Sequence, residues 1–135
     1  MGTLMSQIRT VLLTALLALA PLRAAAELSL IMVQQDGCPW CMKWNEEIGP
    51  IYPKTEEGKT APLRRIDLHE PVPEDLTFKS KARLTPTFIL VDDGMEIARL
   101  EGYPGEDFFW GMLDRMLDQA ETGDGAPDEA TKPEG

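Results

Sequence analysis

The sequence predicts one α/β domain in which a four-stranded mixed sheet is flanked by helices. Two observations indicate this class. Short runs of apolar and β-branched residues alternate along the chain with stretches of helical spacing. The last helical pattern follows two strands that a tight turn joins. Between about residue 27 and residue 120 the apolar residues suffice for a single small core.

The first half of the domain predicts a strand, a helix and a second strand. Residues 28–33 form an apolar run typical of a buried strand, and residues 42–51 place apolar side chains at helical spacing. A Gly-Pro step and a Tyr-Pro step late in this pattern are expected to end or kink the helix. Residues 55–62 then form a polar connection, and residues 63–68 form the second strand.

The second half predicts a hairpin followed by a helix. Residues 74–84 follow two prolines that break the second strand, and they predict a weak helix or an irregular crossover. Residues 87–91 are β-formers, residues 92–94 (Asp-Asp-Gly) are a turn signal, and residues 95–101 alternate as a fourth strand. Acidic residues at the start of the next segment favour a helix N-terminus. Its apolar positions are Phe109, Met112, Leu113, Met116 and Leu117.

Both cysteines lie in the segment Gly37-Cys38-Pro39-Trp40-Cys41, where the first strand gives way to the first helix. The N–H groups and positive dipole end of a helix N-terminus stabilise a thiolate, which is the species that attacks disulfides. Pro39 fits the first helical turn, where its missing N–H costs nothing. Cys38 is expected at the helix tip with its sulfur toward solvent, and Cys41 one turn inside and less exposed. The pair therefore predicts reversible dithiol chemistry, with Pro39 and Trp40 as the active-site dipeptide.

Two other interpretations of the cysteine pair remain open, a zinc half-site and a pair of packing cysteines. A zinc site needs about four ligands, whereas this chain offers two thiols and one histidine, His69. A soft Cys-x-x-Cys pair is also able to carry Cu(I), but no methionine lies inside the motif. We therefore expect no metal and no cofactor.

The first 26 residues are typical of a secretory signal peptide. They contain no acidic residue, and Arg9 precedes the apolar stretch 11–22, which Ala24-Ala25-Ala26 follows. We expect cleavage before Glu27 and export. An uncleaved membrane anchor is the alternative, but about a dozen apolar residues are too few to span a bilayer.

The mature chain is strongly acidic. All 23 acidic residues lie after residue 26, against the 11 basic residues that remain when Arg9 and Arg23 are removed, so its net charge is −12. This charge disfavours nucleic acid and anionic membrane surfaces as partners. Residues 121–135 are rich in Gly, Pro, Asp and Glu without apolar periodicity, and we expect this tail to be disordered.

With the dithiol at its first helix, the order of elements resembles the minimal thioredoxin fold. The resemblance covers residues 28–117, and its most specific second element is Thr85-Pro86-Thr87, which opens an apolar strand. It implies that Pro86 is cis beside the active-site disulfide, that Thr85 pairs with the substrate backbone and that Gly102 allows close approach. The plainer interpretation is that Pro86 merely opens an edge strand.

The chain also departs from thioredoxins proper. They carry Gly-Pro between the cysteines and a buried Asp six residues before the first one, where this chain has Pro39-Trp40 and Met32. The dipeptide changes thiolate stability, and redox potentials in the superfamily range from about −270 mV to about −120 mV. The sequence therefore does not set the direction of electron flow.

A narrower resemblance is to the periplasmic thioredoxins of bacterial sulfur-oxidation clusters, carried by residues 44–55, 61–68 and 101–110. It implies a periplasmic thiol-disulfide oxidoreductase that reduces cysteines in thiosulfate-oxidising proteins, with a carrier protein as one partner. A membrane electron donor of the thiol-relay type would recharge it, and we expect a monomer. A disulfide-forming oxidase and a Cu(I)-binding carrier are the alternatives.

Overall fold

A computed structural model of the chain describes residues 27–123; the predicted signal peptide and residues 124–135 of the predicted tail lie outside these residues. The sheet contains β1 (Leu28–Gln34), β2 (Leu63–Asp67), β3 (Thr87–Asp92) and β4 (Met95–Glu101). The helices are α2 (Pro39–Glu47), the 3-10 turn η2 (Tyr52–Lys54), α3 (Glu56–Thr60) and α4 (Glu106–Thr122). The α/β class and the mixed four-stranded sheet are confirmed.

The strands lie in the order β2-β1-β3-β4. β1 pairs in parallel with β2, while β3 is antiparallel to both β1 and β4. The carboxyl ends of β1, β2 and β4 and the amino end of β3 therefore meet at one edge of the sheet. Segments that are far apart in the sequence leave the sheet at this edge, and both cysteines lie in one of them.

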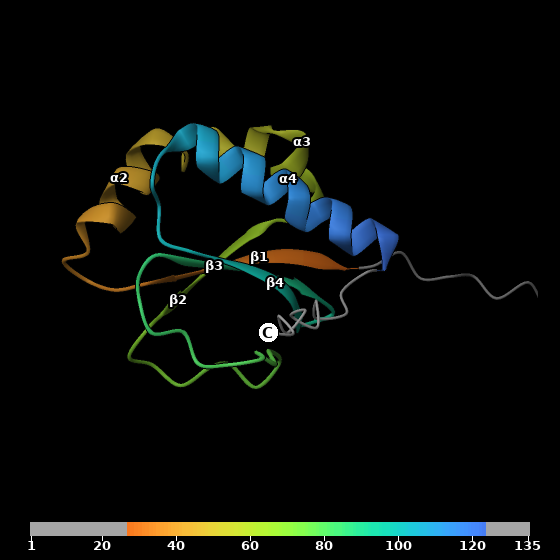
Figure 1. Cartoon of the computed structure of the whole chain (residues 1–135). Helices are drawn as coiled ribbons and strands as arrows, with labels where there is room; N and C mark the ends of the chain where they lie inside the picture. Colours follow the sequence, from red (N-terminus) through yellow and green to blue (C-terminus); the bar gives the residue numbers. More distant parts are fainter. Residues whose placement is uncertain (1–26, 124–135) are drawn as a thin grey trace, which may run out of the picture.

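The two faces of the sheet are covered differently. Figure 1 shows α2, α3 and α4 over one face, while the segment between β2 and β3 runs beneath the other. The core under the helices is built around four aromatic side chains whose rings pack against one another: Trp44, Tyr52, Phe88 and Phe109. The smaller core on the opposite face contains Ile31, Val33, Leu76, Ala82, Ile89 and Val91. Because both faces are buried, residues 30–33 of β1 and 88–91 of β3 are continuous apolar runs and do not alternate.

The structure decides two elements that the sequence left open and corrects a third. The first helix ends at Glu47, just before the Gly-Pro step that was expected to end or kink it, and the chain then turns through η2. Residues 55–62, predicted as a polar connection, contain α3, whose N-cap Thr55 accepts the Gly58 N–H at 3.0 Å. Residues 74–84 hold no helix, so the irregular alternative is the correct one.

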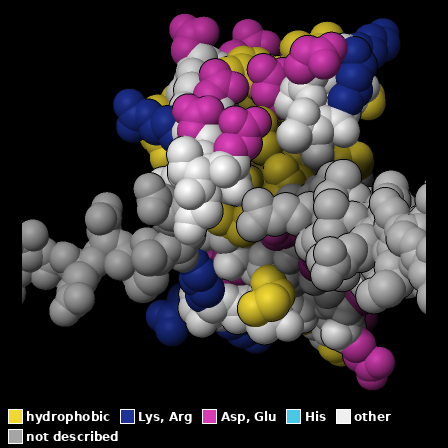
Figure 2. Space-filling model, turned by 90° about the vertical axis from the view of Figure 1, so that its right-hand side faces the viewer, with side chains coloured by type: hydrophobic (Ala, Val, Ile, Leu, Met, Phe, Trp, Pro, Cys, Tyr) yellow, Lys and Arg dark blue, Asp and Glu magenta, His cyan; other side chains and the backbone are white. Residues whose placement is uncertain are grey.

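At the end of the molecule opposite the cysteines, the surface formed by the helices is acidic. Figure 2, which views this end of the molecule, shows Asp and Glu side chains gathered on its upper part. α4 contributes the exposed Asp114, Asp118 and Glu121.

Within residues 27–123, no helix combines the length and the apolar character that crossing a membrane requires.

Candidate active site

Cys38 is the N-cap residue of α2. Its backbone is extended (φ −81°, ψ 108°), and its sulfur accepts the backbone N–H of Cys41 at 3.1 Å. Pro39 follows as the first helical residue. The two cysteines form a disulfide with their Cα atoms 5.3 Å apart. The sulfur of Cys38 thus accepts a backbone N–H at the helix N-terminus, an environment that favours a thiolate once the bond is reduced.

The expected difference in exposure between the cysteines is small. Cys38 is 6% exposed and Cys41 3%, so the sulfur of Cys38 does not stand out into solvent. Both belong to the core under the helices. What separates the two residues is their position on α2, because only Cys38 precedes the first turn and accepts a helix N–H.

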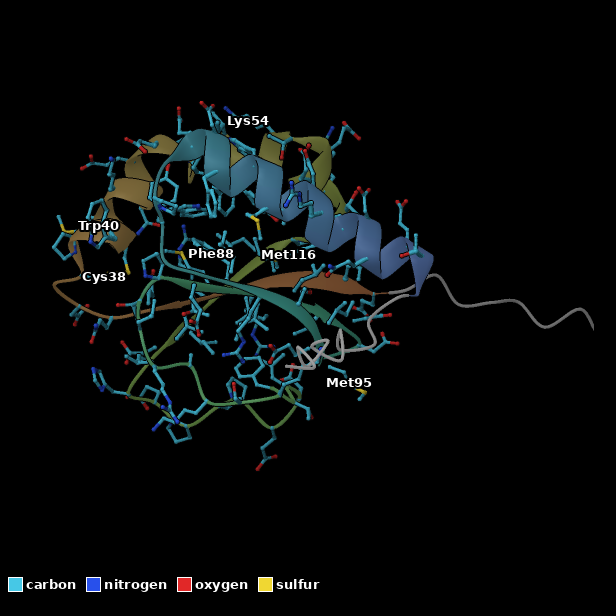
Figure 3. The ribbon with its side chains drawn as sticks, in the orientation of Figure 1. Cys38, Trp40, Lys54, Phe88, Met95 and Met116 are labelled. Carbon is cyan, nitrogen blue, oxygen red and sulfur yellow. A yellow bond between two sulfur atoms is a disulfide. The ribbon has the colours of Figure 1, made fainter. Side chains whose placement is uncertain are left out.

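Trp40 stands at the surface beside the disulfide. Figure 3 shows it with Cys38 at the start of α2, and its side chain is 55% exposed. The ammonium of Lys43 lies 5.6 Å from the centre of the Trp40 ring and 3.9 Å from a carboxylate oxygen of Glu47. Glu47 in turn accepts the Tyr103 hydroxyl at 2.6 Å. A chain of contacts therefore links the active-site dipeptide to the loop between β4 and α4.

The Thr85–Pro86 peptide bond is cis. The carbonyl of Pro86 accepts the Gly102 N–H at 2.7 Å, which joins the segment before β3 to the one after β4. Gly102 has φ +87°, a backbone conformation that residues other than glycine rarely adopt. No atom lies within 4 Å of the position that an added Cβ would take. The structure thus brings Thr85, Pro86 and Gly102 to the same sheet edge as the cysteines.

An apolar residue occupies the position that the buried acid has in thioredoxins. Met32, at that position in β1, is fully buried. Besides the cysteines, the titratable side chains of the core cluster under the helices are Tyr52 and Tyr103. Burial and the hydrogen bond to Glu47 raise the pKa of Tyr103 well above its ordinary value, so it is a neutral phenol at physiological pH.

Two polar residues at this edge were not among the predicted site residues. The amide of Gln35, just after β1, donates to the Thr85 hydroxyl at 2.9 Å. Its oxygen lies 2.9 Å from Nε2 of His69, just after β2. No local sequence pattern signals this contact; only the parallel pairing of β1 with β2 brings the residues together.

Residues 27–123 contain no group of three or more His, Cys, Asp or Glu side chains placed to hold a metal ion. The two thiols are joined to each other. Electron and proton exchange at this pair is the chemistry that the described site supports.

Comparison with known proteins agrees with this geometry. A thioredoxin-like domain family matches residues 17–117. The crystal structure of the periplasmic thioredoxin SoxS from Paracoccus pantotrophus, in its reduced form, is similar with 49% sequence identity and a TM-score of 0.69. The match covers 70% of this chain and 99% of that one. A comparison with curated proteins finds no match. The chain therefore belongs to the thioredoxin-like family and, with its disulfide-bonded Cys38–Cys41 pair, is a thiol–disulfide oxidoreductase.

Proposed function

We propose that this protein is a periplasmic reductase that keeps cysteines of sulfur-oxidation proteins in the thiol state. The observation that carries the proposal is the 49% identity to periplasmic SoxS across 99% of that chain. The sequence adds the features of an exported protein in residues 1–26. A carrier protein with a reactive cysteine is the expected partner.

Cys38 is proposed as the nucleophile because it caps α2. Its thiolate attacks one sulfur of the partner's disulfide, which releases the other partner sulfur as a thiolate and leaves a mixed disulfide. The sulfur of Cys41 then attacks the Cys38 sulfur of the mixed disulfide. This step forms the Cys38–Cys41 disulfide and releases the second partner sulfur as a thiol. Two electrons and two protons pass from the dithiol to the partner. With Met32 in the usual acid's position, the departing partner thiolate is the base available to take the Cys41 proton.

Thr85, Pro86 and Gly102 are proposed to hold the partner's backbone, and Trp40 to contact its surface. The first three residues lie at the sheet edge next to the disulfide. Trp40 lies at the N-terminal end of α2, which carries the disulfide, and its side chain is more than half exposed. Since the extracytoplasmic setting oxidises such a dithiol, a membrane donor of the thiol-relay type would have to recharge it. The protein is proposed to act as a monomer.

The experiment that tests the partner uses variants that stop the reaction halfway. Cys41→Ser, expressed in the native periplasm, should trap mixed disulfides with a short list of proteins that includes a sulfur-oxidation carrier. Cys38→Ser is the matched control and should trap none. Capture of many unrelated secreted proteins would replace the specific reductase with a general folding factor. Equal trapping by both variants would remove the nucleophile assignment.

The redox potential of the Cys38–Cys41 couple tests the direction. A reductase is expected near the thioredoxin value of about −270 mV, whereas a disulfide-forming oxidase lies near about −120 mV. Equilibration with glutathione measures this redox potential.

For the export proposal, the intact mass of the mature protein should match a chain that begins at Glu27.

A further inference from the structure

Three side chains on one face of α2 form a chain of contacts that begins at the active-site dipeptide. Trp40, Lys43 and Glu47 follow one another at spacings of three and four residues, which place their side chains on the same helix face. The ammonium of Lys43 lies over the Trp40 ring, 5.6 Å from its centre, and 3.9 Å from Oε1 of Glu47. The other carboxylate oxygen of Glu47 accepts the Tyr103 hydroxyl at 2.6 Å. Because Tyr103 is buried, the chain of contacts ends on a fixed point of the core.

Each contact limits the freedom of the next side chain. An exposed indole ring has several rotamers available, and a cation over its face favours the one in which the two groups meet. Glu47 keeps that cation near the ring. Lys43 also borders a groove of about 430 Å³, to which α4 contributes the exposed Glu106 and Asp107. Without Glu47, these two carboxylates would draw the ammonium away from Trp40.

The contact with Lys43 leaves part of the Trp40 ring open to a partner. Trp40 lies between the two cysteines in the sequence and is 55% exposed, and Figure 3 shows it beside Cys38 at the start of α2. An ammonium over one face of an indole leaves the opposite face free. That face is an apolar plane next to the disulfide, and exposed tryptophans are favoured anchors in protein interfaces. An apolar side chain close to the partner's reacting cysteine fits this surface.

We propose that Lys43 and Glu47 are positioning residues that hold the Trp40 ring as a fixed platform for an apolar side chain flanking the partner's reacting cysteine. This inference rests on the proposed contact of Trp40 with the partner's surface. Holding the ring before the partner arrives spares the cost of ordering it during binding, so the partner with the apolar side chain reacts faster.

Two peptide disulfides that differ only in their apolar side chains test this platform. The reduced protein is mixed with the symmetric disulfide of acetyl-Gly-Leu-Cys-Leu-Gly-amide, and in parallel with that of acetyl-Gly-Gly-Cys-Gly-Gly-amide. Each second-order rate is divided by the rate of the same peptide with dithiothreitol, which removes differences in intrinsic reactivity. The leucine-to-glycine ratio then cancels the ionisation of Cys38, because both reactions need the same thiolate. If neither peptide were reduced, the proposed function would fail; the platform is tested by the ratio.

The wild type is expected to reduce the leucine peptide about 3- to 10-fold faster, because the contact covers part of a leucine side chain. Trp40→Ala should bring the ratio close to that of dithiothreitol. Lys43→Gln should lower the ratio by roughly 2- to 5-fold toward the same value, the span of one exposed cation–π contact. Glu47→Gln keeps an acceptor for Tyr103 and should lower the ratio by about 2-fold. Lys43→Arg should restore the wild-type ratio, since a guanidinium is also attracted to the ring.

The order of the Trp40 side chain reports the positioning directly. The heteronuclear NOE of its indole N–H measures motion on the ps–ns timescale. This NOE should fall in Lys43→Gln and in Glu47→Gln, whereas the values for Trp44 and Trp110 should stay the same. Because Trp40 and Lys43 are exposed, their substitution opens no cavity in the core.

Two matched controls remove comparable charges outside the chain of contacts. Lys59→Gln removes an exposed lysine whose ammonium pairs with Glu56 in α3. Glu106→Gln removes a carboxylate of the groove that Lys43 borders. Both controls should keep the wild-type ratio and the wild-type order of Trp40.

Three results would overturn the proposal. The first is a wild type that does not prefer the leucine peptide, and the second is an unchanged Trp40 NOE in Lys43→Gln. The third concerns the double variant, because Lys43→Gln should lower the ratio no further once Trp40→Ala is present. A further fall there would show that Lys43 contacts the partner itself and does not act through the ring.

Discussion

Replacing Gly102 with alanine isolates the energetic cost of one backbone conformation at the site. Gly102 has φ +87°, and no atom lies within 4 Å of the position that a Cβ would take, so the new methyl group meets no clash. The cost is that of a left-handed conformation for an L-residue, about 1–2 kcal/mol. For a domain of 60–100 residues, each kcal/mol shifts Tm by about 4–8 °C. We therefore expect Tm to fall by about 4–16 °C.

Gly111→Ala is the matched comparison. It lies inside α4, is exposed and also has no atom within 4 Å of the added Cβ, but its backbone is helical. Alanine is favoured over glycine in a helix interior by about 0.8–1.0 kcal/mol, so this variant should melt about 3–8 °C higher. Gly102→Asn should cost less than Gly102→Ala, because asparagine tolerates positive φ better. Thermal unfolding of the oxidised proteins measures all three. The reasoning would be refuted if both alanine variants shifted Tm in the same direction.

Three further predictions concern the aromatic residues of the core. Tyr52→Phe keeps the ring but removes the hydroxyl that donates to the buried carbonyl of Ala61 at 2.7 Å. The free energy of unfolding, measured with urea, should therefore fall by about 1–3 kcal/mol. No loss would mean that the carbonyl finds another donor. Phe109→Ala should cost about 3–5 kcal/mol by the same measurement, because Phe109 is fully buried among five other aromatic rings. A cost below about 1 kcal/mol would show that the core collapses around the gap. Burial and Glu47 raise the pKa of Tyr103, so the folded state holds the phenol proton more tightly than the unfolded state does. The resulting contribution to the free energy of unfolding is fully present below about pH 10 and is lost as pH rises through the folded pKa. Between about pH 9 and pH 11 the wild type should therefore lose more unfolding free energy than Tyr103→Phe, which differs from it only in the phenol hydroxyl. Equal losses would contradict the raised pKa of Tyr103.

Much of the fold was predictable because its signals are local. The apolar runs of β1 and β3, the turn before β4 and the spacing of α4 each depend on neighbouring residues. The helix α3 was not predicted. α3 is only five residues long, and such short helices depend on a cap and on tertiary contacts more than on an apolar period.

The sequence by itself determined the chemistry of this protein, because the motif Cys38-Pro39-Trp40-Cys41 carries both thiols and the start of the helix that caps them. Only the tertiary structure decided what surrounds that chemistry. Gln35 meets Thr85 across 50 residues of sequence, and Tyr103 meets Glu47 across 56. These contacts follow from strand order and register, which bring the ends of four strands to one edge. No pattern within a single segment contains that information, since a side chain's partner across a sheet depends on how separate segments pair.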